Sequence, residues 1–340
     1  MGNFQQKSLF TGGGIVFALL LVLARFGMID LYVQSVIMFI GINIIFATSL
    51  SIVNGYMGEF SCGHAGFMAV GAYVSSVLSV LLFTDNKLLG GALLPPSMAI
   101  YIFPFIILFG GIVAAFAGLI VAIPSFKTRD DYLAIITIAV NFIIVTALNN
   151  MAVVGGSRGF MGMKKVIYGM TDVVKFPYML FWVGTFVVLT IFLIRRFFTS
   201  TYGKGIIAIK QDEVAAEIMS VDTNKMKVVA FMFSSGLAGI SGGLFAHVVG
   251  YVNPSSFSIL KSTEALVMVY LAGMGSLSGS VISAILFTLL LEILRPFAIL
   301  KWVIIPLILI LVMQFRPEGL MGDKELSDFF PKLKKFYKFK

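Results

Sequence analysis

Long apolar runs separated by short polar loops recur along almost the whole chain, and no other feature restricts its fold so strongly. Only 12% of the residues are charged, whereas a soluble domain has about a quarter. Lipid offers no partners for backbone polar groups, and transmembrane barrels need short alternating segments, so runs of this length predict an all-α bundle. We predict a polytopic transmembrane helical bundle of about eight to ten spans. The candidate spans are residues 10–29, 33–53, 62–83, 98–123, 131–151, 177–195, 228–249, 260–274, 279–296 and 299–315, of which 260–274 and 299–315 are short.

The distribution of Lys and Arg predicts that both termini are cytoplasmic, because inner loops are enriched in basic residues. Residues 1–9 would form a cytoplasmic N-terminus, residues 10–321 one transmembrane domain with a cytoplasmic loop at 196–227, and residues 322–340 a basic cytoplasmic tail. The 152–176 loop is then expected outside, although it also carries basic residues. The net charge of +9 lies largely in loops and the tail. It fits contact with anionic lipid headgroups rather than with nucleic acid.

The chain lacks the groups that most enzymes and metalloproteins need. Its single cysteine, Cys62, excludes an internal disulfide and a cysteine cluster for a metal. His64 has no second ligand at metal-binding spacing, and His247 stands alone in an apolar span, as a packing residue would. No phosphate-binding loop of the form Gly-x-x-x-x-Gly-Lys-Ser/Thr occurs. We expect no catalytic residue, metal or cofactor in this chain; ATP-driven transport would require ATP and Mg in partner chains.

The segment from residue 204 to 227 is polar, although it lies between two long apolar spans. It carries acids, lysines and an apolar stripe near helical spacing. One interpretation is a helix that docks into a groove of a soluble partner; the other is a helix lying on lipid headgroups. Anionic lipid would repel its acids, which favours docking. The candidate coupling residues are Asp212, Glu213, Ala215, Ala216, Glu217 and Ser220.

Five glycines lie between residues 55 and 71, beside small and polar residues. Because glycine costs about 1 kcal/mol per helix position, this density predicts a close helix contact or a helix break that lines a path for solute. A plain loop followed by a tightly packed helix explains it equally well. The candidate path or gate residues are Gly55, Gly58, Ser61, Gly63, His64 and Glu264.

Glu264 joins that set because an acid in an apolar run is a functional candidate by default. Its alternative role is to pair with the dipole at the start of a helix. In the loop expected outside, Gly155, Gly156 and Arg158 could form a turn on which an external partner docks, or an ordinary flexible loop. Glu292 and Arg295 have the spacing of an ion pair on one helix.

Several blocks along the chain, taken together and in order, resemble the permease subunits of branched-chain amino-acid ABC importers, and most closely the LivM-type subunit. They extend from about residue 40 to residue 321. The blocks are Gly55-Tyr56-x-Gly58-x-x-Ser61-x-Gly63-His64-Ala65-x-Phe67, Asp131-Tyr132-Leu133-Ala134-Ile135, Gly155-Gly156-x-x-Gly159, Asp212-Glu213-x-Ala215-Ala216-Glu217 with Lys227-Val-Val-Ala230-Phe231, Ser256-Phe257 with Glu264, Gly273-x-Gly275-Ser276-x-x-Gly279, and Phe315-Arg316-Pro317-x-Gly319-Leu320.

The resemblance implies a bacterial inner-membrane importer that works by alternating access. It implies a second homologous permease subunit, two cytoplasmic ATP-binding subunits and an extracytoplasmic solute-binding protein, with the coupling helix inside residues 204–226. One position departs from the family pattern: Ser220 stands where the family usually has glycine. Because glycine ends a helix in a left-handed turn at little cost, the end of the coupling helix is the point that this departure affects.

The sequence leaves three alternatives. The cargo could be urea, short amides or nucleosides, because similar permeases carry these. An ion-coupled secondary transporter would need acids within the membrane, with Glu264 as the main candidate. A membrane-embedded enzyme would need a paired catalytic constellation, and the sequence shows none.

Overall fold

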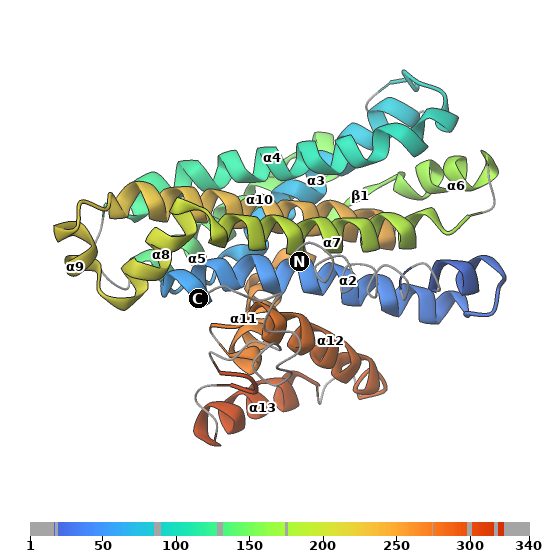
Figure 1. Cartoon of the computed structure of the whole chain (residues 1–340). Helices are drawn as coiled ribbons and strands as arrows, with labels where there is room; N and C mark the ends of the chain where they lie inside the picture. The colour runs from blue at the N-terminus through green and yellow to red at the C-terminus, as the bar shows by residue number, and fades with distance from the viewer. Residues whose placement is uncertain are drawn as a thin grey trace, which may run out of the picture.

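The structure, a computed structural model, describes residue 17 and residues 20–84, 90–127, 132–173, 176–273, 275–297, 301–315 and 319–322. The expected N-terminal segment 1–9, the beginning of the expected span 10–29, and almost all of the expected tail 322–340 lie outside these residues. Six long helices form the main body (Figure 1). They are α2 (Leu31–Ser51), α3 (His64–Phe83), α4 (Ala99–Ser125), α5 (Tyr132–Asn150), α7 (Tyr178–Thr199) and α10 (Thr223–Val249).

The other elements are short. A π-helical segment, Ile52–Met57, extends α2, and two strands, β1 (Phe160–Met161) and β2 (Tyr251–Val252), pair antiparallel with Phe160 opposite Val252. The 3-10 turns are Pro96–Met98, Ala152–Val154, Gly156–Arg158 and Pro254–Phe257. The remaining helices are α6 (Met163–Val173), α8 (Thr201–Gln211), α9 (Glu213–Ile218), α11 (Ile259–Ala272), α12 (Leu277–Ile293) and α13 (Lys301–Phe315).

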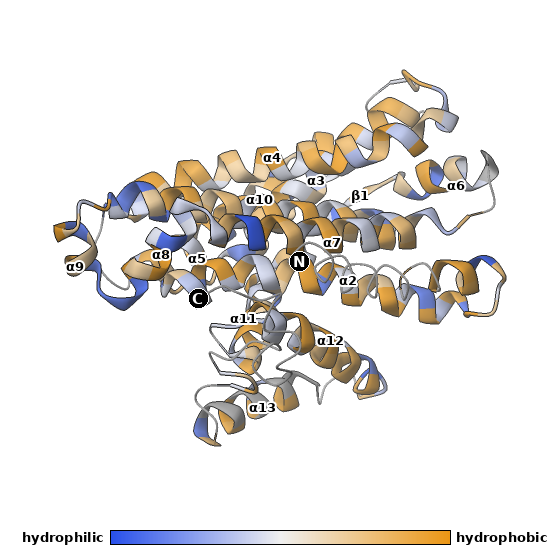
Figure 2. Cartoon of the chain, in the orientation of Figure 1, coloured by the Kyte–Doolittle hydropathy of each residue, from blue (hydrophilic) through white to orange (hydrophobic). Residues whose placement is uncertain are grey.

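Six described helical stretches are long and apolar enough to cross a membrane, which supports a multi-pass membrane protein. Apolar residues cover most of their length, and polar residues gather around α8 and α9 at one end of the bundle (Figure 2). The expected spans 260–274, 279–296 and 299–315 appear as α11, α12 and α13, with 14, 17 and 15 residues. These are shorter than the roughly 20 residues of a full crossing, so the span count stays a prediction. The 152–176 region is not a plain loop, because it contains β1 and α6.

Helix α10 lies at the centre and packs against α2, α3 and α4. Its contact with α3 is made through backbone. A Cβ at Gly71 would collide with the Gly239 backbone, and one at Gly242 would collide with the carbonyl oxygen of Met68. Small residues allow this close approach. The dense glycines of α3 are therefore a packing face, as one of the two sequence interpretations stated.

His247 is a fully buried packing residue in this contact, as the sequence predicted. Its Nδ1 donates to the Gly243 carbonyl at 2.7 Å, its Nε2 lies 2.9 Å from the Ser79 hydroxyl, and Phe103 covers the ring edge-on. The ring therefore joins α10 to α3 with both nitrogens partnered.

Helices α11 to α13 lie to one side of the main body, below α2 in Figure 1. Helix α12 packs on α2. Inside this interface the side-chain amide of Asn43 (Nδ2) donates a hydrogen bond to the Thr288 hydroxyl at 2.9 Å. Helix α11 contacts α2, α3 and α5, and so lies beside the break between α2 and α3.

Candidate functional site

The helical chain is interrupted between the π-helical segment that extends α2 and the start of α3. The π-helical segment ends at Met57 and is followed by Gly58, whose φ of 80° and ψ of 6° are left-handed and suit glycine. Residues 58–63, which we call the interrupted segment, are irregular, and α3 begins at His64. The glycine-rich stretch therefore contains a helix break as well as a packing face. That the break lines a path for solute stays a prediction.

Helix α3 begins inside the bundle and not at its edge. His64 is fully buried, and its Nε2 lies 3.0 Å from the Ser49 hydroxyl of α2 and 3.5 Å from the Ser234 hydroxyl of α10. Ser234 is 11 residues beyond Thr223, the first residue of α10, which is about 17 Å along the helix axis. The interrupted segment therefore runs back into the protein interior.

Side chains of neighbouring helices satisfy the irregular backbone there. The Ser61 amide donates to Asn54 Oδ1 at 3.3 Å, and the Cys62 amide donates to the Thr137 hydroxyl of α5 at 3.2 Å. The Ala65 amide donates to the Ser262 hydroxyl of α11 at 2.9 Å. Non-helical backbone at membrane depth is stable only when protein or water supplies such partners, so α5 and α11 make the break possible.

Three predicted path residues come together at this break. Ser61 and His64 are fully buried, and Ser61 Oγ and His64 Nδ1 have no hydrogen-bond partner among the described residues. Gly63 between them is obligatory, because a Cβ there would collide with the Thr137 carbonyl oxygen. Gly55 lies within the π-helical segment.

Glu264 lies on α11 and already has a partner. Its Oε2 is 2.7 Å from Lys261 Nζ, and both side chains are mostly buried. The Lys261 ammonium also lies 6.0 Å from the centre of the Phe245 ring. Glu264 is thus an ion-paired acid in the first turns of α11; its part in a solute path stays a prediction.

The polar segment folds as the short helices α8 and α9 and the first turn of α10, and a side-chain cap begins each of these three helices. Asp212 accepts a hydrogen bond from the Ala215 amide at 2.9 Å and begins α9, and Asp222 accepts one from the Lys225 amide at 3.0 Å and begins α10. Ser200 begins α8 in the same way. Such caps are each worth about 1 kcal/mol, which lets a helix as short as α9 form at a defined place.

Ser220 ends this arrangement in a left-handed conformation, with φ of 63°. Among the described residues it is the only non-glycine residue with positive φ. Ser220 therefore has the left-handed backbone conformation that glycine adopts at low cost, and its Cβ makes this conformation strained. Helix α9 ends at Ile218, shortly before this residue.

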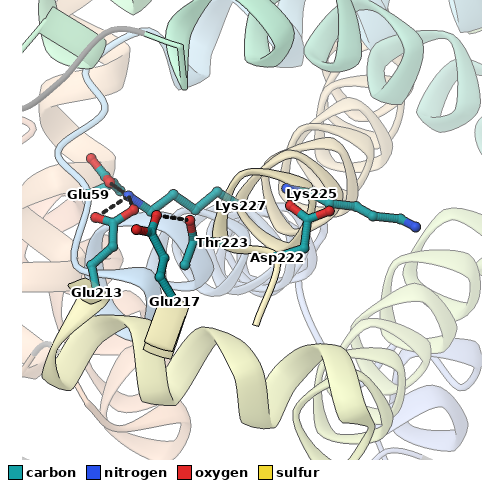
Figure 3. Close-up of polar contacts among 7 residues, drawn as sticks. All are labelled: Glu59, Glu213, Glu217, Asp222, Thr223, Lys225 and Lys227. Carbon is teal, nitrogen blue, oxygen red and sulfur yellow. Dashed lines mark hydrogen bonds and ion pairs between the residues drawn. The ribbon is translucent and has the colours of Figure 1, made fainter. Parts of the chain in front are cut away.

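Glu213 and Glu217 of α9 point toward Lys227 and Thr223 of α10 (Figure 3), whereas the large apolar side chains of the same segment are exposed. Glu213 bonds Lys227, and Glu217 Oε1 accepts a hydrogen bond from the Thr223 hydroxyl at 3.0 Å. Ala216 is buried, whereas Ala215 is exposed. The outer face, which we call the α9 apolar face, consists of Val214, Ile218 and Met219, exposed by 65%, 79% and 78%.

Lys227 joins the two parts of the site. Its Nζ lies 2.7 Å from Glu59 Oε1, in the interrupted segment, and 2.8 Å from both carboxylate oxygens of Glu213, on α9. We call this set the Lys227 bridge; its Lys227–Glu59 and Lys227–Glu213 contacts are drawn in Figure 3. Lys227 is only 7% exposed. A buried ammonium needs such partners, because an unpaired one would be costly.

Sequence reasoning missed the Lys227 bridge. Glu59 and Lys227 are 168 positions apart, so no helical spacing links them. The available signal was a lysine directly before the long apolar run from Val228 onward, together with an acid inside a glycine-rich segment. A charged side chain is rarely buried unless it is paired with an opposite charge. That rule would have suggested Lys227 and Glu59 as a pair.

At the other end of the bundle, the predicted docking residues form a defined turn. Gly155, Gly156 and Gly159 have positive φ, and a Cβ at Gly155 would collide with the Gly159 carbonyl. The Tyr251 hydroxyl donates to the Arg158 carbonyl at 2.7 Å, which fixes the turn against β2. The turn is thus ordered; that a partner docks on it stays a prediction.

Comparisons with known proteins agree on one family. Residues 32–313 match the family described as "Branched-chain amino acid transport system / permease component". The chain is 30% identical over 309 residues to a permease protein of Escherichia coli K12, the high-affinity branched-chain amino acid transport system protein LivM, covering 82% of this chain and 68% of that protein. It is 22% identical to a probable LivM of Methanocaldococcus jannaschii (88% and 95% covered) and 22% identical to LivH of Escherichia coli K12 (83% and 91% covered). No solved structure matches.

Proposed function

The chain belongs to the family of permease components of branched-chain amino acid transport systems, and from this we propose that it moves Leu, Ile and Val inward across a bacterial inner membrane. It would be the transmembrane subunit of an ATP-driven importer and would perform no bond chemistry itself. The matches to LivM and to LivH both support this cargo. Urea, short amides and nucleosides have no such support from the comparisons.

The observation that carries the proposal is the arrangement of side chains on α9, at the end of the bundle that α8 and α9 form and that we call the polar end. Helix α9 projects beyond the bundle (Figure 1), its acids are engaged within the chain, and an apolar face of three large side chains is left outward. An amphipathic helix with exposed apolar anchors suits a hydrophobic groove on a soluble partner. We assign that partner as a cytoplasmic ATP-binding subunit, which would hold the ATP and Mg.

The orientation follows from the same assignment. With α9 in the cytoplasm, the Gly155–Gly156–Arg158 turn lies at the opposite, extracytoplasmic end, where a solute-binding protein could dock. A second homologous permease subunit would complete the membrane part. The break at residues 58–63 would then act as a gate on the solute path.

The ion-coupled carrier is less well supported. Such a carrier needs an acid that exchanges its partner during transport. Glu264, the main candidate, is paired with Lys261 three residues earlier on the same helix, as an acid with a structural role would be.

The proposal is tested by purifying the tagged chain in detergent from its native membrane and identifying bound proteins by mass spectrometry. The complex is then reconstituted in proteoliposomes with the binding protein and radiolabelled leucine. We expect a second permease, two nucleotide-binding subunits, and leucine uptake that requires ATP. A chain that purifies alone and accumulates solute under an ion gradient without ATP would contradict the proposal.

A further inference from the structure

We propose that the Lys227 bridge transmits the movement of α9 to the interrupted segment, so that Lys227 and Glu59 are positioning residues for ATP-driven transport. The inference rests on the proposed function. It goes beyond that function by naming the residues through which the polar end of the protein would act on the break between α2 and α3.

The bridge uses the full hydrogen-bonding capacity of the lysine. An ammonium has three N–H donors, and three carboxylate oxygens lie within 2.8 Å of Nζ: one from Glu59 and two from Glu213. The contact is therefore directional at both acids. A displacement of Glu213 stretches hydrogen bonds to a lysine that also holds Glu59.

Burial makes the connection stiff. The side chains of Lys227 and Glu59 are 9% and 22% exposed, whereas that of Glu213 is 45% exposed. A buried lysine that loses one acid is left undercompensated, so it keeps its partners when the backbone around it moves. The least exposed part of the bridge is the Lys227–Glu59 pair, which leads into the protein.

Glu59 stands at the start of the segment that would have to move. Its amide donates to the Val53 carbonyl of the π-helical segment at 3.1 Å, and five residues later the chain enters α3 at His64. Lys210, on α8, lies beside the neighbouring Gly58: a Cβ added there would be 3.3 Å from its Cγ. Helix α10 therefore bonds the interrupted segment at Glu59, and α8 lies close to it at Gly58.

If the Lys227 bridge only stabilised the fold, its loss would have a different outcome. Loss of a brace lowers the yield of the assembled complex, and ATP hydrolysis and uptake then fall together. Loss of a transmitting contact leaves the assembly and its ATP hydrolysis in place and stops the solute. The ratio of solute moved to ATP hydrolysed separates the two roles.

The first experiment uses the reconstituted complex with Glu59→Gln, which keeps the shape of the side chain and leaves Lys227 paired with Glu213. Lys227→Met removes the bridge, and Lys227→Arg keeps its charge. The matched control is Lys225→Met, because Lys225 lies two residues earlier on α10 and is exposed. We expect Glu59→Gln and Lys227→Met to lower leucine uptake per ATP at least tenfold at unchanged complex yield, while Lys227→Arg and Lys225→Met retain most of it.

A second readout uses Cys62, the single cysteine of this chain, three residues beyond Glu59. Its rate of maleimide labelling, followed by mass spectrometry of this subunit, should differ between nucleotide-free and non-hydrolysable-ATP states of the parent complex. In Glu59→Gln this difference should disappear. Full uptake per ATP in Glu59→Gln, an unchanged nucleotide effect on Cys62 in that variant, or a parallel fall of yield, hydrolysis and uptake would each overturn the inference. A parent complex without ATP-dependent uptake would instead refute the proposed function itself.

Discussion

The Thr223 hydroxyl donates a 3.0 Å hydrogen bond to the Glu217 carboxylate, and so fastens the last turn of α9 to the first turn of α10. Ser220 lies between these two residues with φ of 63°. The Val221 amide also donates back to the Ala216 carbonyl at 3.1 Å. Because both sides of the turn are held, Ser220 cannot leave the left-handed region without breaking one of these contacts.

Replacing Ser220 by glycine should therefore stabilise the protein. Glycine adopts positive φ without the steric cost that serine bears, a gain of up to about 1 kcal/mol, less the entropy of a more flexible unfolded chain. We expect a slightly higher midpoint of thermal unfolding in detergent and slower proteolysis between α9 and α10. Ser220→Ala is the control, because alanine keeps the strain; equal gains in the two variants would contradict the explanation.

Charge on the α9 apolar face should prevent assembly without harming the fold. Val214→Asp and Ile218→Asp place a carboxylate on side chains exposed by 65% and 79%, so the isolated chain should lose little stability. A buried unpaired charge at an interface costs several kcal/mol, so copurification of the ATP-binding subunits should fall at least tenfold. Gln211→Asp adds the same charge on an exposed residue just outside this face and should leave assembly intact. Normal assembly of both face variants would show that α9 docks through other residues.

Gly63→Ala should damage the break between α2 and α3. The added Cβ meets the backbone of Thr137, which cannot move aside as a flexible side chain can, and such overpacking costs about 1–3 kcal/mol or more. Gly66→Ala is the graded comparison, because its Cβ would meet Asn141 at 3.2 Å and needs only a small shift. The midpoint of thermal unfolding in detergent should be well lower for Gly63→Ala than for Gly66→Ala. The reverse order would mean that α5 does not pack tightly against Gly63.

His247→Leu should loosen the contact of α10 with α3. The change removes the hydrogen bond to Gly243 within α10 and the contact with Ser79 of α3. A hydrogen bond between membrane helices is worth about 0.6 to 1.7 kcal/mol, and the loss of the bond within α10 adds to it. We expect a loss of about 1–2 kcal/mol in thermal or denaturant stability. Ser79→Ala should cost less, because it leaves the hydrogen bond between His247 and the Gly243 carbonyl in place. His247→Leu should cost less in the Ser79→Ala background than in the parent, because the contact between the two side chains is already lost there; equal losses in the two backgrounds would show that this contact adds no stability.

The sequence predicted the long helices well, because each depends on a local run of apolar residues. It also identified the polar segment 204–227, since its composition contrasts with both neighbours. It could not predict that Glu213 and Glu217 turn inward, because the contacts that orient them, to Lys227 and Thr223, depend on how α9 folds back on α10. The role of Gly63 was equally hidden, since Thr137 approaches it from a helix 74 residues away in sequence.

The glycine contact between α3 and α10 limits how the protein can change shape. With Gly71 against Gly239 and Gly242 against Met68, a slide of one helix along the other would put a side chain where only bare backbone fits. The two helices must then turn together as one rigid body. Any opening toward either side of the membrane has to come from hinges in the surrounding helices, among them α5, which presses on the start of α3 and is itself largely exposed.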